Sequence, residues 1–261
     1  MHCMAFDIET VPDTALGRRL LDLEPTLSDE DVAKAMAFKR LQEAETEFLP
    51  LFQHRIVAIS VALRSGDQFR IWSLGSESSD EAELIRRFFD GLDQYRPDLV
   101  SWNGGGFDLP VLQYRSLRHG IVAQTYWEIG DEDRSFRYNN YLNRYHWRHT
   151  DLMDVLSGFQ NRARASLDDI ATMLDLPGKM GLKGDQVWGR YLAGDLSGIR
   201  DYCETDVLNT YLVYLRFQHI RGLLDAAGLA AEEARVRAAL QASDAAHLQE
   251  FLTAWDAAAG Q

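Results

Sequence analysis

Two apolar stretches joined by a short turn place the strongest limit on the fold. Residues 55–64 (RIVAISVALR) and 68–74 (QFRIWSL) have strand composition, and the Ser-Gly-Asp between them predicts a hairpin. Residues 2–8 form a further apolar strand, and residues 97–103 form another after a helix predicted over 79–95. Strand, helix, strand order favours parallel pairing. We therefore predict an α/β chain in which a three-strand antiparallel meander joins a parallel strand and helices flank the sheet.

Further helices are predicted at residues 108–118, 166–175, 198–220 and 231–256. A helical insertion capped near Ser28 is predicted at about 27–48, between the first two strands. It is interpreted as a packing helix in preference to a lid or substrate guide. We expect one domain over residues 1–220 that contains this insertion, with residues 221–261 as its C-terminal helical extension.

Composition narrows the classes of function. The net charge of −13 and the pI near 4.9 argue against a protein that coats nucleic acid by bulk electrostatics, which requires clustered Lys and Arg. No stretch is long and apolar enough for a membrane span, so no membrane partner is expected. Two cysteines, Cys3 and Cys203, provide neither a disulfide framework nor a zinc spacing, which suits a reducing cytoplasm.

The first strand carries two carboxylates in the segment MAFDIET, residues 4–10. Side chains alternate across a strand, so Asp7 and Glu9 share one face. Two like charges this close repel each other unless a cation lies between them. A divalent cation is the obvious candidate, and a strand end at which both carboxylates point into water is the alternative.

Two more segments present carboxylates near helices. In SWNGGGFDLPVL, residues 101–112, Asp108 stands at the carboxyl end of a strand, where it is either a presented ligand or a plain helix N-cap. In DYCETDVLNTYLVYLR, residues 201–216, Tyr202 and Asp206 are four residues apart and share a helix face. The alternative there is that Tyr202 packs and Asp206 is solvated. Cys203 is expected to face away from Tyr202 and to be inert.

Together, the order of elements brings Asp7, Glu9, Asp108 and Asp206 to one edge of the sheet. Four hard oxygen ligands favour two divalent ions, Mg²⁺ or Mn²⁺, rather than zinc. Two such ions activate a water and stabilise the leaving oxygen of a phosphodiester. Asp7 is the natural bridging ligand because it lies on a central strand.

The segments FDIET, SWNGGGFDLP and YCETD together resemble the three motifs of the DEDD 3'-5' exonucleases of the ribonuclease H-like superfamily, in the subclass with a Tyr-x-x-x-Asp third motif. The chain is also similar to the proofreading exonuclease domain of family B DNA polymerases, from residue 4 to about residue 216. The resemblance implies a ribonuclease H-like fold with a mixed five-stranded sheet, in which the three-strand antiparallel meander is joined by parallel strands. It further implies four carboxylates, namely those of Asp7, Glu9, Asp108 and Asp206, that hold two metal ions. It also implies that Tyr202 orients the attacking water.

The implied reaction is 3'-5' hydrolysis of single-stranded or frayed nucleic acid to nucleoside 5'-monophosphates. The resemblance favours DNA, although no element that reads a 2'-hydroxyl is identifiable. A polymerase, a helicase or another recruiting protein would then be a partner. The alternatives are a non-catalytic nucleic-acid-binding or polymerase-accessory module and a ribonuclease H-like endonuclease.

Substrate contacts are predicted mainly from residue type. Residues 134–150 contain four arginines, a run of aromatic side chains and no acid, which suits either base stacking or packing against the core. The candidate substrate-binding residues are Thr10, Asn103, Phe107, Arg144 and Lys179. Phe107 is either a wedge against a terminal base or a buried core residue, and Lys179 lies in a Gly-rich turn.

Overall fold

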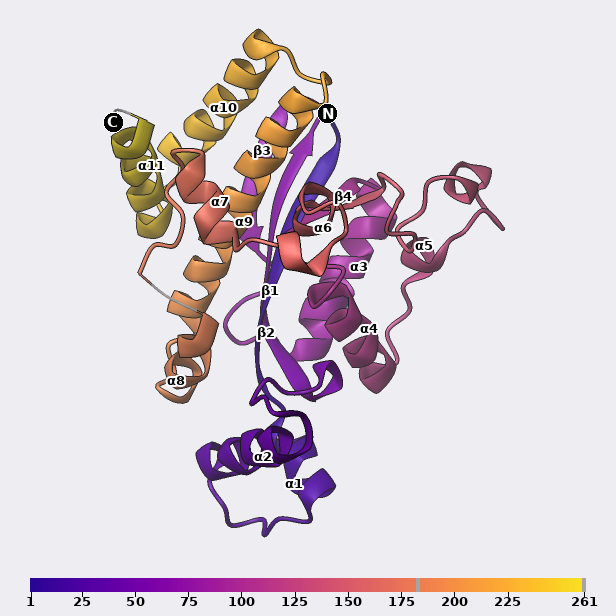
Figure 1. Ribbon diagram of the computed structural model, residues 1–261, viewed down its shortest axis with the longest axis vertical. Coiled ribbons are helices and arrows are strands. Elements are labelled where there is room, and N and C mark those ends of the chain that lie inside the picture. Colours follow the sequence, from indigo (N-terminus) through magenta and orange to yellow (C-terminus); the bar gives the residue numbers. More distant parts are fainter. Residues whose placement is uncertain (182–183, 260–261) are drawn as a thin grey trace.

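The computed structural model describes residues 1–181 and 184–259, and its centre is a five-stranded sheet in the order β3-β2-β1-β4-β5 (Figure 1). The strands are β1 (Cys3–Pro12), β2 (His54–Ser65), β3 (Gln68–Ser73), β4 (Asp98–Ser101) and β5 (His149–Asp151). β2 pairs antiparallel with β1 and β3, whereas β4 pairs parallel with β1 and β5. The predicted α/β class and mixed five-stranded sheet are confirmed, and the arrangement is consistent with a ribonuclease H-like fold.

Helices cover both faces of the sheet (Figure 1). On one face α9 (Leu196–Ile220) packs against β1, β2, β3 and β4, and α7 (Leu167–Met173), α8 (Val187–Leu192) and α10 (Ala226–Gln241) pack against α9. On the other face lie α3 (Glu81–Tyr95), α4 (Asp108–His119) and α5 (Gln124–Trp127). α6 (Leu152–Leu156) follows β5 directly. Two separate apolar cores fill the layers, so the sheet is buried on both sides.

Short 3-10 helices connect several of these elements, at Leu51–Gln53, Arg134–Arg137, Asn161–Ala163 and Gly184–Gln186. None of the helices within residues 1–181 and 184–259 combines the length and apolar content needed to cross a lipid bilayer. Cys3 and Cys203 are both free and buried.

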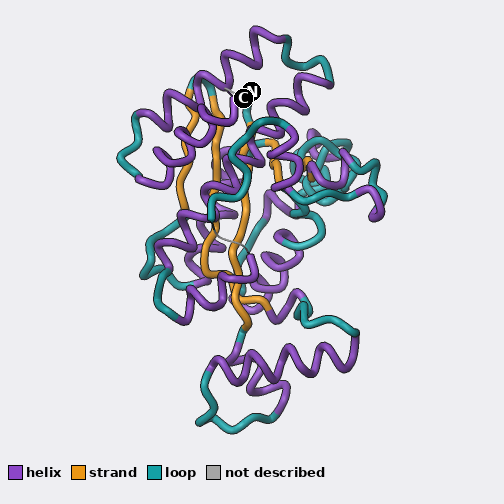
Figure 2. Tube along the Cα trace, turned by 60° about the vertical axis from the view of Figure 1, so that its left-hand side comes forward, coloured by secondary structure: helices purple, strands orange, loops and turns teal. Residues whose placement is uncertain are grey.

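The insertion between β1 and β2 is larger than predicted. It contains two helices, α1 (Thr14–Leu21) and α2 (Asp29–Ala44), which project beyond the end of the sheet as an arm (Figures 1 and 2). Ser28 caps α2 as expected, because its Oγ accepts a hydrogen bond from the backbone N–H of Asp31 at 3.1 Å. Helix α1 was not predicted, and Asp13 caps it by accepting from the N–H of Leu16 at 3.0 Å.

The C-terminal region also differs from the prediction. The single helix expected at 231–256 is two helices, α10 and α11 (Ala246–Ala259), and α11 packs on α9 and α10. The helical conformation is interrupted between them, where the Oγ of Ser243 accepts a hydrogen bond from the N–H of Ala245 at 3.2 Å. This local hydrogen bond competes with those of a continuous helix. A buried ion pair of 2.6 Å between Arg64 and Glu232 fixes α10 to β2. The boundary expected at residue 220 stays a prediction.

Candidate metal centre

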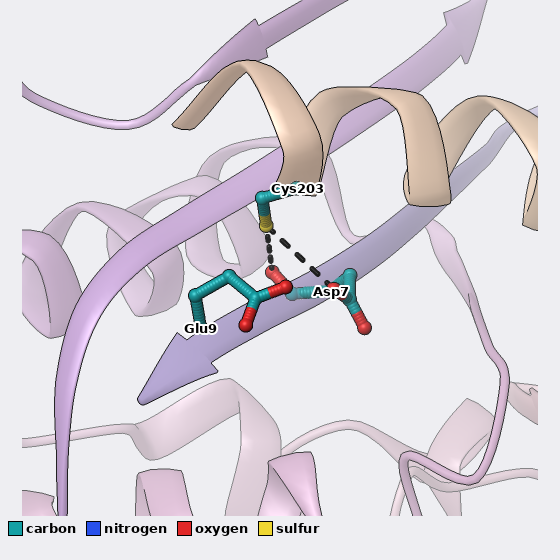
Figure 3. A group of neighbouring side chains, drawn as sticks. All are labelled: Asp7, Glu9 and Cys203. Atoms are coloured by element: carbon teal, nitrogen blue, oxygen red, sulfur yellow. Dashed lines mark hydrogen bonds between the residues drawn. The ribbon is translucent and has the colours of Figure 1, made fainter. Parts of the chain in front are cut away.

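Two carboxylates project from the carboxyl half of β1. Asp7 pairs with Ser60 and Glu9 with Ala58 in β2, so both side chains lie on the same face of the sheet. Glu9 is 9% exposed and Asp7 is partly buried. One oxygen of each carboxylate and the Sγ of Cys203 lie within 4.8 Å of one another (Figure 3). The alternative in which both carboxylates point into water is therefore wrong.

The third carboxylate reaches β1 because β4 is short. β4 pairs with β1 only as far as Ala5 and Val100, so the next part of β1 has no strand on that side. There the Oδ1 of Asp108 accepts a hydrogen bond from the N–H of Ile8 at 3.1 Å. Asp108 is 3% exposed and is the first residue of α4, whose N-cap position is Phe107. Asp108 is thus not a plain helix cap.

The glycine-rich loop before Asp108 is held by a residue that sequence reasoning missed. The Asp151 carboxylate, at the end of β5, accepts hydrogen bonds from the backbone N–H groups of Asn103 and Gly105, each at 2.9 Å. Asn103 has a left-handed backbone with a φ of 63°. A Cβ on Gly104 would lie 2.5 Å from the Cβ of buried Ser101, so this close approach requires glycine. No spacing in the sequence points to Asp151 as the partner of this loop.

Helix α9 supplies the remaining predicted residues. Tyr202 and Asp206 lie one turn apart on this helix, as the spacing predicts. Between them, the Sγ of Cys203 lies 3.5 Å from the carbonyl oxygen of Asp7 and 3.7 Å from its Oδ2 (Figure 3). The sequence analysis did not predict this contact between Cys203 and Asp7, and the expectation that Cys203 faces away from Tyr202 stays a prediction. Burial raises the pKa of the Cys203 thiol well above its ordinary value, so the thiol stays protonated.

The four carboxylates affect one another strongly. Burial raises the pKa of Asp7 and of Glu9 well above the ordinary values, and the charges of Asp108 and Asp206 raise both further. Burial also raises the pKa of Asp108 to about 7, against the opposing hydrogen bond from Ile8. It raises the pKa of Asp206 to about 6, against the opposing hydrogen bond from Tyr202. Four ionised carboxylates are therefore unfavourable here without a cation.

The chemistry of this donor set fits divalent ions. The Oδ1 atom of Asp206 is buried, and within the described residues it has no hydrogen-bond partner. A buried carboxylate oxygen without a partner is costly, and a metal ion would satisfy it. Oxygen donors are the ligands that Mg²⁺ and Mn²⁺ prefer, whereas the protonated Cys203 is a poor ligand for either ion.

The predicted substrate residues differ in how near they lie to these carboxylates. Thr10 follows Glu9 directly, and its Oγ1 lies 2.9 Å from the Nδ1 of His54. Phe107 is partly buried and its ring lies 5.2 Å from that of His54 and 5.9 Å from that of Phe48. Phe107 is therefore neither a fully buried core residue nor a ring without aromatic contacts.

Lys179 is exposed and close enough to lower the pKa of both Glu9 and Asp206 through its charge. Asn103 uses its backbone to form the turn before Asp108, since its carbonyl accepts from Gly106 and Phe107. Arg144 lies beside α6 and forms an ion pair of 2.6 Å with Asp154 of that helix. The roles of these residues in substrate binding stay predictions.

Comparison with known proteins identifies the family. Residues 46–255 match a family described as "Predicted 3'-5' exonuclease related to the exonuclease domain of PolB". A stretch of 112 residues is also 29% identical to the DNA polymerase 1 of Sulfurisphaera ohwakuensis, and it covers 37% of this chain and 13% of the polymerase. The matched polymerase is thus a much longer protein. Since the family match extends over most of the chain, the protein belongs to the family of predicted 3'-5' exonucleases related to the exonuclease domain of PolB.

Proposed function

We propose that this protein is a metal-dependent 3'-5' exonuclease that removes nucleoside 5'-monophosphates from single-stranded or frayed 3' ends. The ligands of two divalent ions, Mg²⁺ or Mn²⁺, would be Asp7, Glu9, Asp108 and Asp206. The observation that carries the proposal is the buried Oδ1 of Asp206, which has no hydrogen-bond partner among the described residues and whose charge acts on two further carboxylates, Asp7 and Glu9. The name of the matched relative, a DNA polymerase, favours DNA as the substrate.

Each protein group has a role that follows from its surroundings. When bound, the two ions supply a water of lowered pKa and stabilise the leaving oxygen. Asp7 would be the ligand shared by the two ions, since it lies on a central strand between Asp108 and the α9 residues. Burial and the charge of Asp206 raise the pKa of Tyr202 far above its ordinary value. The phenol therefore stays protonated at neutral pH, so Tyr202 orients the water together with Glu9 and does not act as a base.

The test incubates the purified protein with Mn²⁺ and 5'-labelled DNA or RNA of the same sequence. We expect a ladder that shortens from the 3' end, and no cutting of a circular strand. Asp7→Asn and Asp206→Asn should abolish this ladder, and Tyr202→Phe should slow it on the order of 100-fold because the water is misplaced. Glu83→Gln, which removes a carboxylate from the outer surface of α3, should cleave like the wild type.

A second readout separates loss of metal from loss of catalysis. Mn²⁺ should raise the melting temperature of the wild type and of Tyr202→Phe, but not that of Asp206→Asn. Stabilisation by Mn²⁺ without cleavage of any linear strand would favour a non-catalytic nucleic-acid-binding module. If Mn²⁺ neither stabilises the protein nor supports cleavage, the proposed metal centre is wrong.

A further inference from the structure

One segment of this acidic protein is basic. Residues 134–164 contain six arginines and two aspartates, a net charge of +4 in a chain of −13. Part of the segment packs inward, because Phe136 and Tyr141 are buried and the Arg148 guanidinium stacks 4.0 Å from the Phe136 ring. Packing against the core, one of the two sequence-based alternatives, thus accounts for these aromatic residues. It does not account for the accessible part around Arg144.

Two arginines converge on one carboxylate in this accessible part. The Nη2 of Arg144 lies 2.6 Å from one oxygen of Asp154, and the Nη2 of Arg164 lies 2.7 Å from the other. The Asp154 side chain is 10% exposed, whereas those of Arg144 and Arg164 are 50% and 31% exposed. The two guanidinium groups share one carboxylate, and each guanidinium has five N–H donors. This arrangement holds both arginines in place and leaves N–H groups available for an anion.

An aromatic pair lies beside the two arginines. The ring of Tyr145 is 66% exposed and lies 4.8 Å from that of Phe159. The Arg144 guanidinium lies 5.1 Å from the Phe159 ring and 5.8 Å from the Tyr145 ring. An exposed aromatic ring next to a cation that recognises phosphate is the combination used to bind single-stranded nucleic acid, since bases stack and phosphates pair with arginine.

This cluster lies at the same edge of the sheet as the carboxylates. β1, β4 and β5 run parallel, and β4 and β5 end at Ser101 and Asp151, beside the part of β1 that directly precedes Asp7. Asp154 lies in the first turn of α6, and its N–H donates at 3.3 Å to Asp151, the residue that holds the loop before Asp108. The cluster therefore lies on the β5 side of the loop that leads to Asp108.

From this placement we infer an upstream subsite for single-stranded nucleic acid, in which Arg144 and Arg164 bind a backbone phosphate and Tyr145 stacks on a base. The subsite lies 5' of the bond that is cut, and this direction rests on the proposed exonuclease function. It gives an acidic protein a local means to hold its polyanionic substrate. Binding at the subsite needs no metal ion.

The test measures binding and cleavage separately. Fluorescence anisotropy in EDTA gives the affinity for a single strand of about 12 nucleotides at several salt concentrations. Arg144→Gln should weaken binding about 5- to 10-fold and lower the salt dependence by about one released counterion. Tyr145→Ala should weaken binding on the order of 10-fold and leave the salt dependence unchanged.

Two controls separate a local role from a structural one. Arg87→Gln removes an arginine of similar exposure, 54%, from an ion pair on α3, and it should bind like the wild type. In Arg144→Gln the Asp154 carboxylate still forms its ion pair with Arg164, so we expect the fold to be retained. Circular dichroism checks that the variant is folded. With Mn²⁺, Arg87→Gln should cleave a long single strand like the wild type, whereas Arg144→Gln should raise the KM for that strand.

The outcomes distinguish this inference from the proposed function. Wild-type affinity in both Arg144→Gln and Tyr145→Ala overturns the subsite, even if the protein is an exonuclease. An equal loss in Arg87→Gln, or no binding by the wild type at low salt, overturns it as well. If no strand is cleaved but Arg144→Gln loses affinity and salt dependence, the subsite stands and the exonuclease proposal fails.

Discussion

Replacement of Arg115 by methionine should strongly destabilise the protein. The Arg115 side chain is 2% exposed, and its guanidinium lies 2.7 Å from the Asp13 carboxylate and 2.6 Å from the Glu81 carboxylate. Both carboxylates are also buried, with side-chain exposures of 3% and 7%. Methionine fills much of the same space but carries no charge, so two buried anions lose their principal cation. The hydrogen bond and the charge of Arg115 outweigh burial and keep the pKa of Asp13 below its ordinary value.

The size of the effect follows from the partners that remain. Removal of one member of a buried ion pair costs about 3–5 kcal/mol. Glu81 keeps the N–H of Ile56 and the ring of His119, and Asp13 keeps the N–H of Leu16. These remaining contacts still stabilise the two carboxylates in part, so we expect a loss of about 4 kcal/mol in the free energy of unfolding. For a chain of this size the melting temperature should fall by about 8–16 °C.

Urea unfolding followed by circular dichroism measures this loss. Arg87→Met, which breaks an exposed pair with Glu83, should cost about 0.5 kcal/mol or less. A triple variant, Arg115→Met with Asp13→Asn and Glu81→Gln, should recover at least half of the loss because no unpaired charge stays buried. A cost below about 1 kcal/mol for Arg115→Met would refute the argument that unpaired buried charge dominates.

Two further predictions concern the loop before Asp108 and a buried histidine. Gly104→Ala should lower Mn²⁺-dependent cleavage by at least about 10-fold, because the added Cβ would displace Ser101 and the loop. In the control Gly91→Ala the added Cβ meets no atom within 4 Å, so cleavage should not change. Equal cleavage rates for the two variants would contradict the role of Gly104. Burial lowers the pKa of His149 from 6.5 to about 4, so the unfolded chain binds a proton between these pH values that the folded protein does not. The contribution of His149 to stability should therefore fall by up to about 3 kcal/mol as the pH drops from 6.5 to 4. The carboxylates with raised pKa values act in the opposite direction in the wild type and in His149→Gln alike, so the difference between these two proteins in urea unfolding measures the contribution. A difference that does not change with pH would count against the role of His149.

Local patterns in the sequence were enough to predict the sheet and most of the helices that flank it. The hairpin turn, the alternation of strands and helices, and the cap at Ser28 are short-range signals, and the structure follows them. Helix α1 was missed because its eight residues are too few for a clear period. The two C-terminal helices were merged because an alanine-rich sequence has high helix propensity on both sides of Ser243.

The candidate site was only partly accessible to the same reasoning. Strand and helix periods place Asp7 beside Glu9 and Tyr202 beside Asp206, since these pairs are close in sequence. Contacts between segments that are far apart in the sequence produce no periodic pattern of residues. The sequence therefore gave no sign that Cys203 would lie against Asp7, or that Asp151 would hold the loop before Asp108.

The arm formed by α1 and α2 has a narrow base. Pro12 and His54 are paired residues of β1 and β2, and the N–H of Asp13 donates to the carbonyl of Gln53 at 2.8 Å. The arm is therefore an enlarged hairpin loop, and the strands below it meet as they would around a short turn. Closing a loop of about 40 residues costs about 2 kcal/mol more entropy than closing one of about 4. Evolution can thus lengthen, shorten or exchange this loop at little thermodynamic cost while β1 and β2 keep their register beside the carboxylates.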